Sequence, residues 1–159
     1  MGSWGYKLLM ESQEGLDVLD FLEENIPENF EFRLSEILPL MKQDGLLGKN
    51  FEDIDFLYDS CAIALAELFF MFKDNGKYDF PIVFHEEEDS YGTLSDIKSF
   101  TADKNSLEYL WKCLTDIKDE VPDTNGRREI VDLWRKSDEW ENWQNNLNGL
   151  IERIKKEIE

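Results

Sequence analysis

The side chains that most often carry out chemistry in proteins are scarce in this sequence. It has one histidine, His85, and two cysteines, Cys61 and Cys113. Nucleophilic catalysis of the triad type needs a base that can take up and return a proton, and that base is usually histidine. His85 is followed directly by four acidic residues, 86–89, whose charges favour its protonated form. We therefore expect His85 to be a poor general base at neutral pH, and we predict no catalytic residue.

Metal and cofactor sites are not indicated either. A zinc site needs several Cys and His ligands at close spacing, and the sequence contains no such cluster. The acidic run 86–89 lacks the spacing and central glycine of a calcium loop, so we interpret it as solvated charge, with a weak incidental cation site as the alternative. No Gly-rich phosphate loop or dinucleotide fingerprint is present. Cys61 and Cys113 both lie in apolar, helix-like patterns and are predicted to be buried free thiols.

The unusual property of the chain is its charge. It contains 36 Asp and Glu residues against 17 Lys and Arg residues, which gives a formal net charge of -19. Such a surface repels the phosphate backbone of nucleic acids and anionic membranes, and it attracts cationic partners. We therefore expect a basic protein partner, no nucleic acid and no membrane. A simpler alternative is that acidity only keeps a cytosolic protein soluble.

Hydrophobic spacing predicts a mainly α fold, a compact multi-helix domain in which residues 1–159 form a single unit. The central element is a buried helix over about 52–73, which is apolar on nearly all faces. Near 80–85 we expect at most a short strand or hairpin, because Pro81 interrupts the alternation of apolar residues. The other predicted helices cover 14–26, 30–42 (kinked or shortened by Pro39), a segment from about 94 with a break near 101, then 106–120, 127–135, and a last helix capped by Ser137.

The last helix carries a stripe of large apolar residues at steps of three and four, which predicts a core-facing surface. No secretory signal or membrane-spanning run is recognised, so we expect a cytoplasmic protein. The stripe consists of Trp140, Trp143, Leu147, Leu150 and Ile154.

The start of the chain resembles a bacterial family of unknown function. Residues 1–6, Met-Gly-Ser-Trp-Gly-Tyr, and residues 15–22, Gly-Leu-Asp-Val-Leu-Asp-Phe-Leu, are similar to the opening of domain-of-unknown-function family 4259. Where members of that family often carry an acidic stretch, this chain has residues 8–12, Leu-Leu-Met-Glu-Ser. The resemblance covers about the first 22 residues. It implies kinship with small acidic proteins regarded as immunity partners of polymorphic toxins, and it implies no catalytic residue.

These observations favour an immunity-type protein that binds a basic toxin, such as a nuclease domain, and neutralises it by occlusion. The alternatives are a nucleic-acid mimic, a regulatory binding protein, and an enzyme that uses carboxylates or a cation. Aromatic residues such as Tyr91 and Trp143 would serve as anchors if exposed. The side chains predicted to contact the partner are Glu11, Glu14, Glu23, Glu24, Glu86, Glu87, Glu88, Asp89 and Tyr91.

Overall fold

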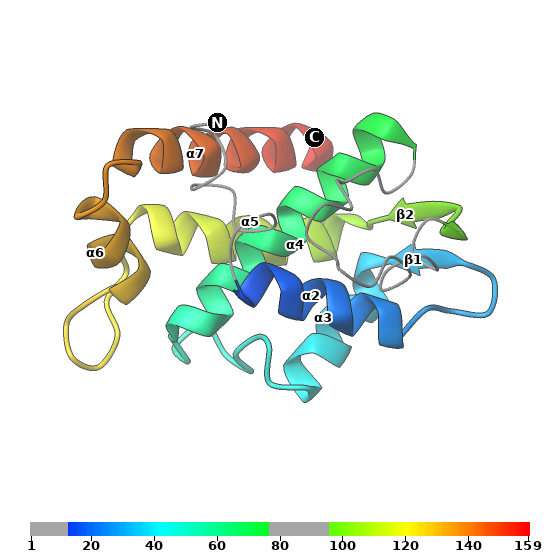
Figure 1. Ribbon diagram of the computed structural model, residues 1–159, viewed down its shortest axis with the longest axis horizontal. Coiled ribbons are helices and arrows are strands. Elements are labelled where there is room, and N and C mark those ends of the chain that lie inside the picture. Colours follow the sequence, from blue (N-terminus) through cyan, green and yellow to red (C-terminus); the bar gives the residue numbers. More distant parts are fainter. Residues whose placement is uncertain (1–12, 77–95) are drawn as a thin grey trace.

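The computed structural model describes residues 13–76 and 96–159 of the chain. This part contains six helices and one pair of short strands, which confirms the mainly α fold predicted from the sequence (Figure 1). The elements in chain order are α2 (Gln13–Glu24), β1 (Glu31–Arg33), α3 (Leu34–Gln43), α4 (Phe56–Asn75), β2 (Ser99–Thr101), α5 (Lys104–Lys118), α6 (Glu129–Arg135) and α7 (Trp140–Ile158).

Helix α4 is the central element, as its apolar sequence predicts. It contacts α2, α5, α6, α7 and β2, and nearly every side chain from 59 to 72 is buried. The helix begins four residues later than predicted because the Asp55 side chain accepts a hydrogen bond from the Leu57 N–H (2.9 Å) and caps it. It ends at Gly76, whose positive φ of 74° allows its N–H to bond the Phe72 carbonyl.

Helices α5 and α7 lie side by side and form the most extensive helix–helix contact of the described residues (Figure 1). The predicted stripe of α7 faces this contact: Trp143, Leu147 and Ile154 are buried, whereas Trp140 is half-buried. Both Leu110 and Leu114 of α5 are fully buried. The interpretation of the α7 stripe as core is therefore confirmed.

The two strands were not predicted. Residues 30–33 were assigned to a helix, and 99–101 to a helical segment, but β1 and β2 pair in parallel with Phe32 opposite Phe100. The helical prediction fails at Phe30 because its φ is positive, 59°, which a right-handed helix does not allow. The neighbouring Asn29 side chain accepts a hydrogen bond from the Glu31 N–H and so forms a turn. The strand expected near 80–85 lies outside the described residues.

Two helix boundaries also differ from prediction. Helix α3 starts at Leu34, four residues later than predicted, and it runs through Pro39 to Gln43, so Pro39 does not end it. Pro39 and Ser35 are both exposed, so water can reach the Ser35 carbonyl that lacks a helical donor. Ser137 does not cap α7: its hydroxyl accepts the Glu139 N–H (2.9 Å) in a turn, and the helix starts at Trp140.

Candidate functional site

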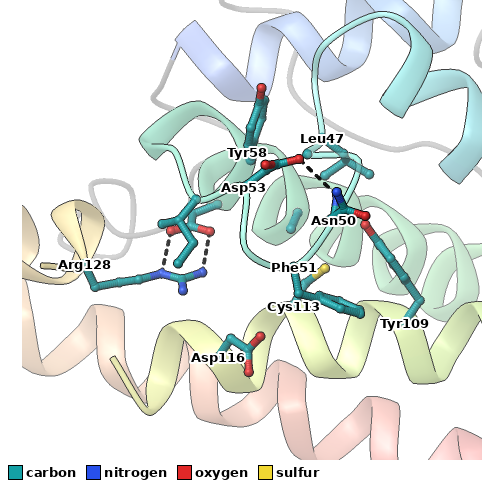
Figure 2. Close-up of a pocket in the computed structure, with 13 residues that line it drawn as sticks. Leu47, Asn50, Phe51, Asp53, Tyr58, Tyr109, Cys113, Asp116 and Arg128 are labelled. Atoms are coloured by element: carbon teal, nitrogen blue, oxygen red, sulfur yellow. Dashed lines mark hydrogen bonds and ion pairs between the residues drawn. The ribbon is translucent and has the colours of Figure 1, made fainter. Parts of the chain in front are cut away.

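A recess with several titratable side chains lies where the loop 44–55, the start of α4, the middle of α5 and the start of α6 meet (Figure 2). Its volume is about 30 Å³, which is room for one or two water molecules. We call it the Asp59 pocket. Its polar and titratable lining residues are Asn50, Asp53, Tyr58, Asp59, Tyr109, Cys113, Asp116 and Arg128.

A buried ion pair forms one wall of the Asp59 pocket. The Arg128 guanidinium donates from Nε to Asp59 Oδ2 (2.9 Å) and from Nη2 to Asp59 Oδ1 (2.7 Å), as Figure 2 shows. Its third group, Nη1, donates to the Val121 carbonyl (2.9 Å). Both side chains are less than a tenth exposed. The pair therefore ties α4 to the segment between α5 and α6.

Burial has a larger effect on the pKa of Asp59 than the neighbouring Arg128 does. Removal from water raises the pKa of Asp59 to about 6, although the hydrogen bonds and charge of Arg128 lower it. The carboxyls of Asp55 and Asp116 add to the increase. At neutral pH the group is still ionised, so the pair with Arg128 is intact there.

The other two carboxyls of the pocket also have partners. Asp53 Oδ2 accepts the backbone N–H of Asn50 (3.1 Å), and Asp116 accepts from Lys112 Nζ, one helical turn away, at 3.2 Å. Each of the three carboxylates that line the recess thus has at least one hydrogen-bond partner. The arrangement stabilises the junction of four segments.

The thiol in the pocket is not a nucleophile at neutral pH. Burial raises the pKa of Cys113 to about 12, and it also raises the pKa of the neighbouring Tyr109. The thiolate is the reactive form of cysteine, so Cys113 is inert near pH 7. Neither cysteine forms a disulfide, which confirms the prediction of free thiols. The predicted burial is confirmed for Cys61, which is fully buried, whereas the Cys113 residue is only half-buried.

Close backbone packing keeps the pocket small. A Cβ atom on Gly48 would lie 2.7 Å from the Asp53 carbonyl oxygen and 3.1 Å from the Tyr58 ring. No side chain fits there without moving backbone. The loop 44–55 can therefore lie against α4 only because residue 48 is a glycine.

The predicted partner-binding residues are only partly visible in the structure. His85, Glu86, Glu87, Glu88, Asp89, Tyr91 and Glu11 lie outside the described residues. Glu14 belongs to α2, but its side chain is not described. Glu24 is exposed, whereas Glu23 is half-buried and its Oε1 has no hydrogen-bond partner within the described ranges. Trp143 is 2% exposed and is excluded as a surface anchor.

Sequence reasoning missed the ion pair of Asp59 and Arg128, which are 69 positions apart. One signal was available, because Asp59 is an acid within the most apolar helix of the chain. An acid in such a place needs a partner. Nothing in the sequence identified Arg128 among the basic residues as that partner.

No group of three or more His, Cys, Asp or Glu residues is placed to hold a metal ion in residues 13–76 and 96–159. Over the same ranges, no helix has the length and apolar character needed to cross a membrane. No family model, curated protein or solved structure matches the chain. Function must therefore be argued from the chain's own residues.

Proposed function

We propose that this protein is an immunity-type protein that binds a basic toxin, such as a nuclease domain, and neutralises it by occlusion. The observation that carries this proposal is the net charge of -19. A basic surface that holds nucleic acid is attracted by such a chain, and the attraction raises the rate of encounter. The resemblance of residues 1–22 to family 4259 supports the same function.

The loop 44–55 is the described surface that fits this role best. Asp44, Glu52, Asp53 and Asp55 are all exposed there, and none of the four forms an ion pair within the described part of the chain. Lys49 is the one base in the loop. The carboxylates therefore give the loop a negative field that a basic partner can enter.

The same loop carries an aromatic ring, Phe51, and the Lys112 ammonium lies 4.8 Å from the centre of that ring. Phe51 is 38% exposed and packs on Tyr109 with ring centroids 5.0 Å apart. Aromatic residues are frequent anchors at protein interfaces, and surrounding charges set orientation and encounter rate. Loop 44–55 thus combines both elements of a contact surface for a basic protein.

The state of the Asp59 pocket supports binding over catalysis. Its three carboxyls have hydrogen-bond partners, and its thiol is protonated at neutral pH. A general base or nucleophile needs a group whose pKa lies near the working pH and which can reach a substrate. Asp59 has such a pKa, but Arg128 occupies both of its oxygens.

The test is capture of the partner from the native host, followed by co-expression. The immobilised protein should retain a basic protein at low salt and release it as salt increases, because exposed ion pairs are screened. Co-expression with the toxic domain of that partner should restore growth of a sensitive strain. Capture of small metabolites only, with no rescue by any retained protein, contradicts the proposal.

A matched pair of variants locates the contact. Asp44→Asn with Glu52→Gln removes two exposed carboxylates of the loop. Glu152→Gln with Glu159→Gln removes two exposed carboxylates, one within α7 and one directly after it, and α7 lies at the opposite edge of the molecule (Figure 1). We expect the loop variant to bind the captured partner more weakly than the α7 variant, although both have the same net charge.

A further inference from the structure

The sequence contains an Asn–Gly pair at three places, residues 75–76, 125–126 and 148–149. Asparagine is one of the thermolabile residues of proteins. Its side-chain amide carbon can be attacked by the backbone nitrogen of the next residue, and a glycine without a Cβ atom hinders that approach least. Since the three pairs share this local chemistry, the fold decides which of them reacts.

Two of the pairs belong to helices. Residues 148 and 149 lie in the interior of α7, where the hydrogen bonds of the helix fix the backbone. Gly76 directly follows α4, and its N–H donates to the Phe72 carbonyl at 2.6 Å. Either glycine nitrogen can turn toward the preceding side chain only if the helix opens locally, and such opening costs free energy. Both pairs should therefore react slowly in the folded protein.

The third pair lies in the loop that joins α5 to α6 at one end of the molecule (Figure 1). Asn125 and Gly126 are both exposed, as are the residues on either side of them. A Cβ atom on Gly126 would meet nothing within 4 Å, so the space around the glycine is open. The Gly126 N–H donates to the Asp123 carbonyl at 3.0 Å within the same turn. Bringing this nitrogen to the Asn125 side chain therefore disturbs a surface turn and not a helix.

We propose that Asn125 is a site of spontaneous deamidation in the folded protein, whereas the pairs at α4 and α7 are protected. The Gly126 nitrogen forms a bond to Cγ of Asn125, the bond from Cγ to the amide nitrogen breaks, and ammonia leaves with the Gly126 N–H proton. Water then adds to one of the two carbonyl carbons of the cyclic imide and opens it. One opening gives aspartate, and the other gives isoaspartate, whose backbone runs through the former side chain.

The product places a new negative charge beside a carboxylate that organises the turn. Asp123 Oδ1 accepts the N–H groups of Arg127 (3.1 Å) and Asn125 (2.8 Å), and these bonds hold the pKa of Asp123 below its usual range. Arg128, which forms the buried pair with Asp59, follows this turn directly. Isoaspartate lengthens the backbone of the turn by an additional carbon atom. We therefore expect it to weaken the turn and the positioning of Arg128.

Ageing of the full chain at mildly alkaline pH tests the site. Digestion and mass spectrometry then follow the peptides that contain the three pairs, since deamidation replaces an amide with a heavier carboxyl group. In the native protein we expect Asn125 to convert about tenfold or more faster than Asn75 and Asn148. In denaturant the three should convert at similar rates, because the helices that protect two of them are gone. Equal rates in the native protein, or faster conversion at either helical pair, overturn the inference.

Two variants separate the chemistry of the site from the effect of charge. Asn125→Gln keeps an amide on a longer side chain, which forms a cyclic imide much more slowly. An isoaspartyl methyltransferase should label aged wild-type protein and label aged Asn125→Gln far less; equal labelling of the two overturns the inference. Asn125→Asp supplies the new charge without lengthening the backbone. Aged wild-type protein should unfold at a lower temperature than fresh Asn125→Asp, and isoaspartate without such a decrease contradicts the expected effect on the turn.

Discussion

The Asp59 pocket differs in how its polar groups are satisfied from a second space, the tryptophan hollow, which is lined by Trp140, Trp143 and Leu147 of α7 together with Ile117 and Val131. In the Asp59 pocket, Asp59 and Arg128 bond each other and leave about 30 Å³ of space. In the tryptophan hollow, Gln144 and Asn148 are exposed to water and make no side-chain hydrogen bond within the described residues, and about 170 Å³ is open. The pocket with more titratable groups is thus the more completely bonded of the two.

The difference is one of burial: the charges of the Asp59 pocket are removed from water, and the amides of the tryptophan hollow are not. A buried charge that already has its hydrogen bonds holds segments together, and its removal harms the fold. Exposed side chains beside an open space face water, and replacing them costs little stability. Variants of the Asp59 pocket should therefore affect stability strongly, whereas substitutions at the exposed residues of the tryptophan hollow should change stability little.

The largest effect is expected for Arg128→Met. It leaves the Asp59 carboxylate buried without its partner, and breaking a buried pair in this way costs about 3–5 kcal/mol. Chemical denaturation at pH 7 measures the free energy of unfolding. Adding Asp59→Asn to Arg128→Met should recover part of the loss, because the unpaired charge is then gone.

An exposed pair of similar geometry serves as the control for Arg128→Met. Arg153 donates to Asp74 through Nη2 (2.7 Å) and Nη1 (3.0 Å), and both side chains are about half exposed. Arg153→Met should cost about 1 kcal/mol or less. Similar losses for the two variants would show that burial of the Asp59 pair has no energetic consequence.

The raised pKa of Asp59 gives a pH dependence of defined sign. The folded protein holds the Asp59 proton up to about pH 6, whereas the unfolded chain releases it near pH 4. Uptake of this proton by the folded protein adds to the free energy of unfolding below pH 4. That contribution, on the order of 2–3 kcal/mol, is lost as the pH rises to 6.

The carboxyl carbon resonance of Asp59 reports this titration directly, with a midpoint expected near pH 6. The unfolding free energy of the wild type minus that of Asp59→Asn should fall between pH 4 and pH 6. Asp74 has the opposite behaviour, because hydrogen bonding to Arg153 lowers its pKa. A midpoint for Asp59 below that of Asp74 contradicts the account.

Gly48→Ala should destabilise the protein by about 1–3 kcal/mol, because the added methyl group overlaps the Asp53 carbonyl. The control is Gly149→Ala, in the middle of α7, where nothing lies within 4 Å of the added atom. That change should stabilise the protein by about 0.5–1 kcal/mol. Thermal unfolding of both variants measures the two opposite shifts.

The smallest effect concerns the thiols. Because burial raises the pKa of Cys113 and Cys61 is inaccessible, the native protein should react with a disulfide reagent at pH 8 only slowly. Both thiols should react quickly in denaturant. Rapid labelling of Cys113 in the native state would show that the Asp59 pocket opens more readily than its bonding implies.

Helix prediction worked best where the apolar pattern was long. Helix α4 and the stripe of α7 followed from spacing, since each buries a face that its own sequence marks. The strand pair of Phe32 and Phe100 did not, because each strand has three residues and pairs with a distant segment. Three residues are too few to show the alternation that marks a strand.

The two recesses were harder to predict than the helices. Asp59 could be noticed as an acid in an apolar helix, but its pairing with Arg128 depends on how α4 and α6 pack. The tryptophan hollow depends on the space left between α5 and α7, a property of three-dimensional packing that residue spacing does not encode. Trp143 was recognised as large and apolar, and it proved to be an inner wall and not an exposed anchor.

The central claim, that a negative surface recognises a basic protein, is tested most directly by the association rate with the captured partner at increasing salt. We predict a rate constant that falls steeply, by about tenfold or more, as ionic strength rises from low to physiological values. The loop variant with Asp44→Asn and Glu52→Gln should show a shallower salt dependence than the α7 control. A rate that is independent of salt, or equal slopes for the two variants, would contradict the account.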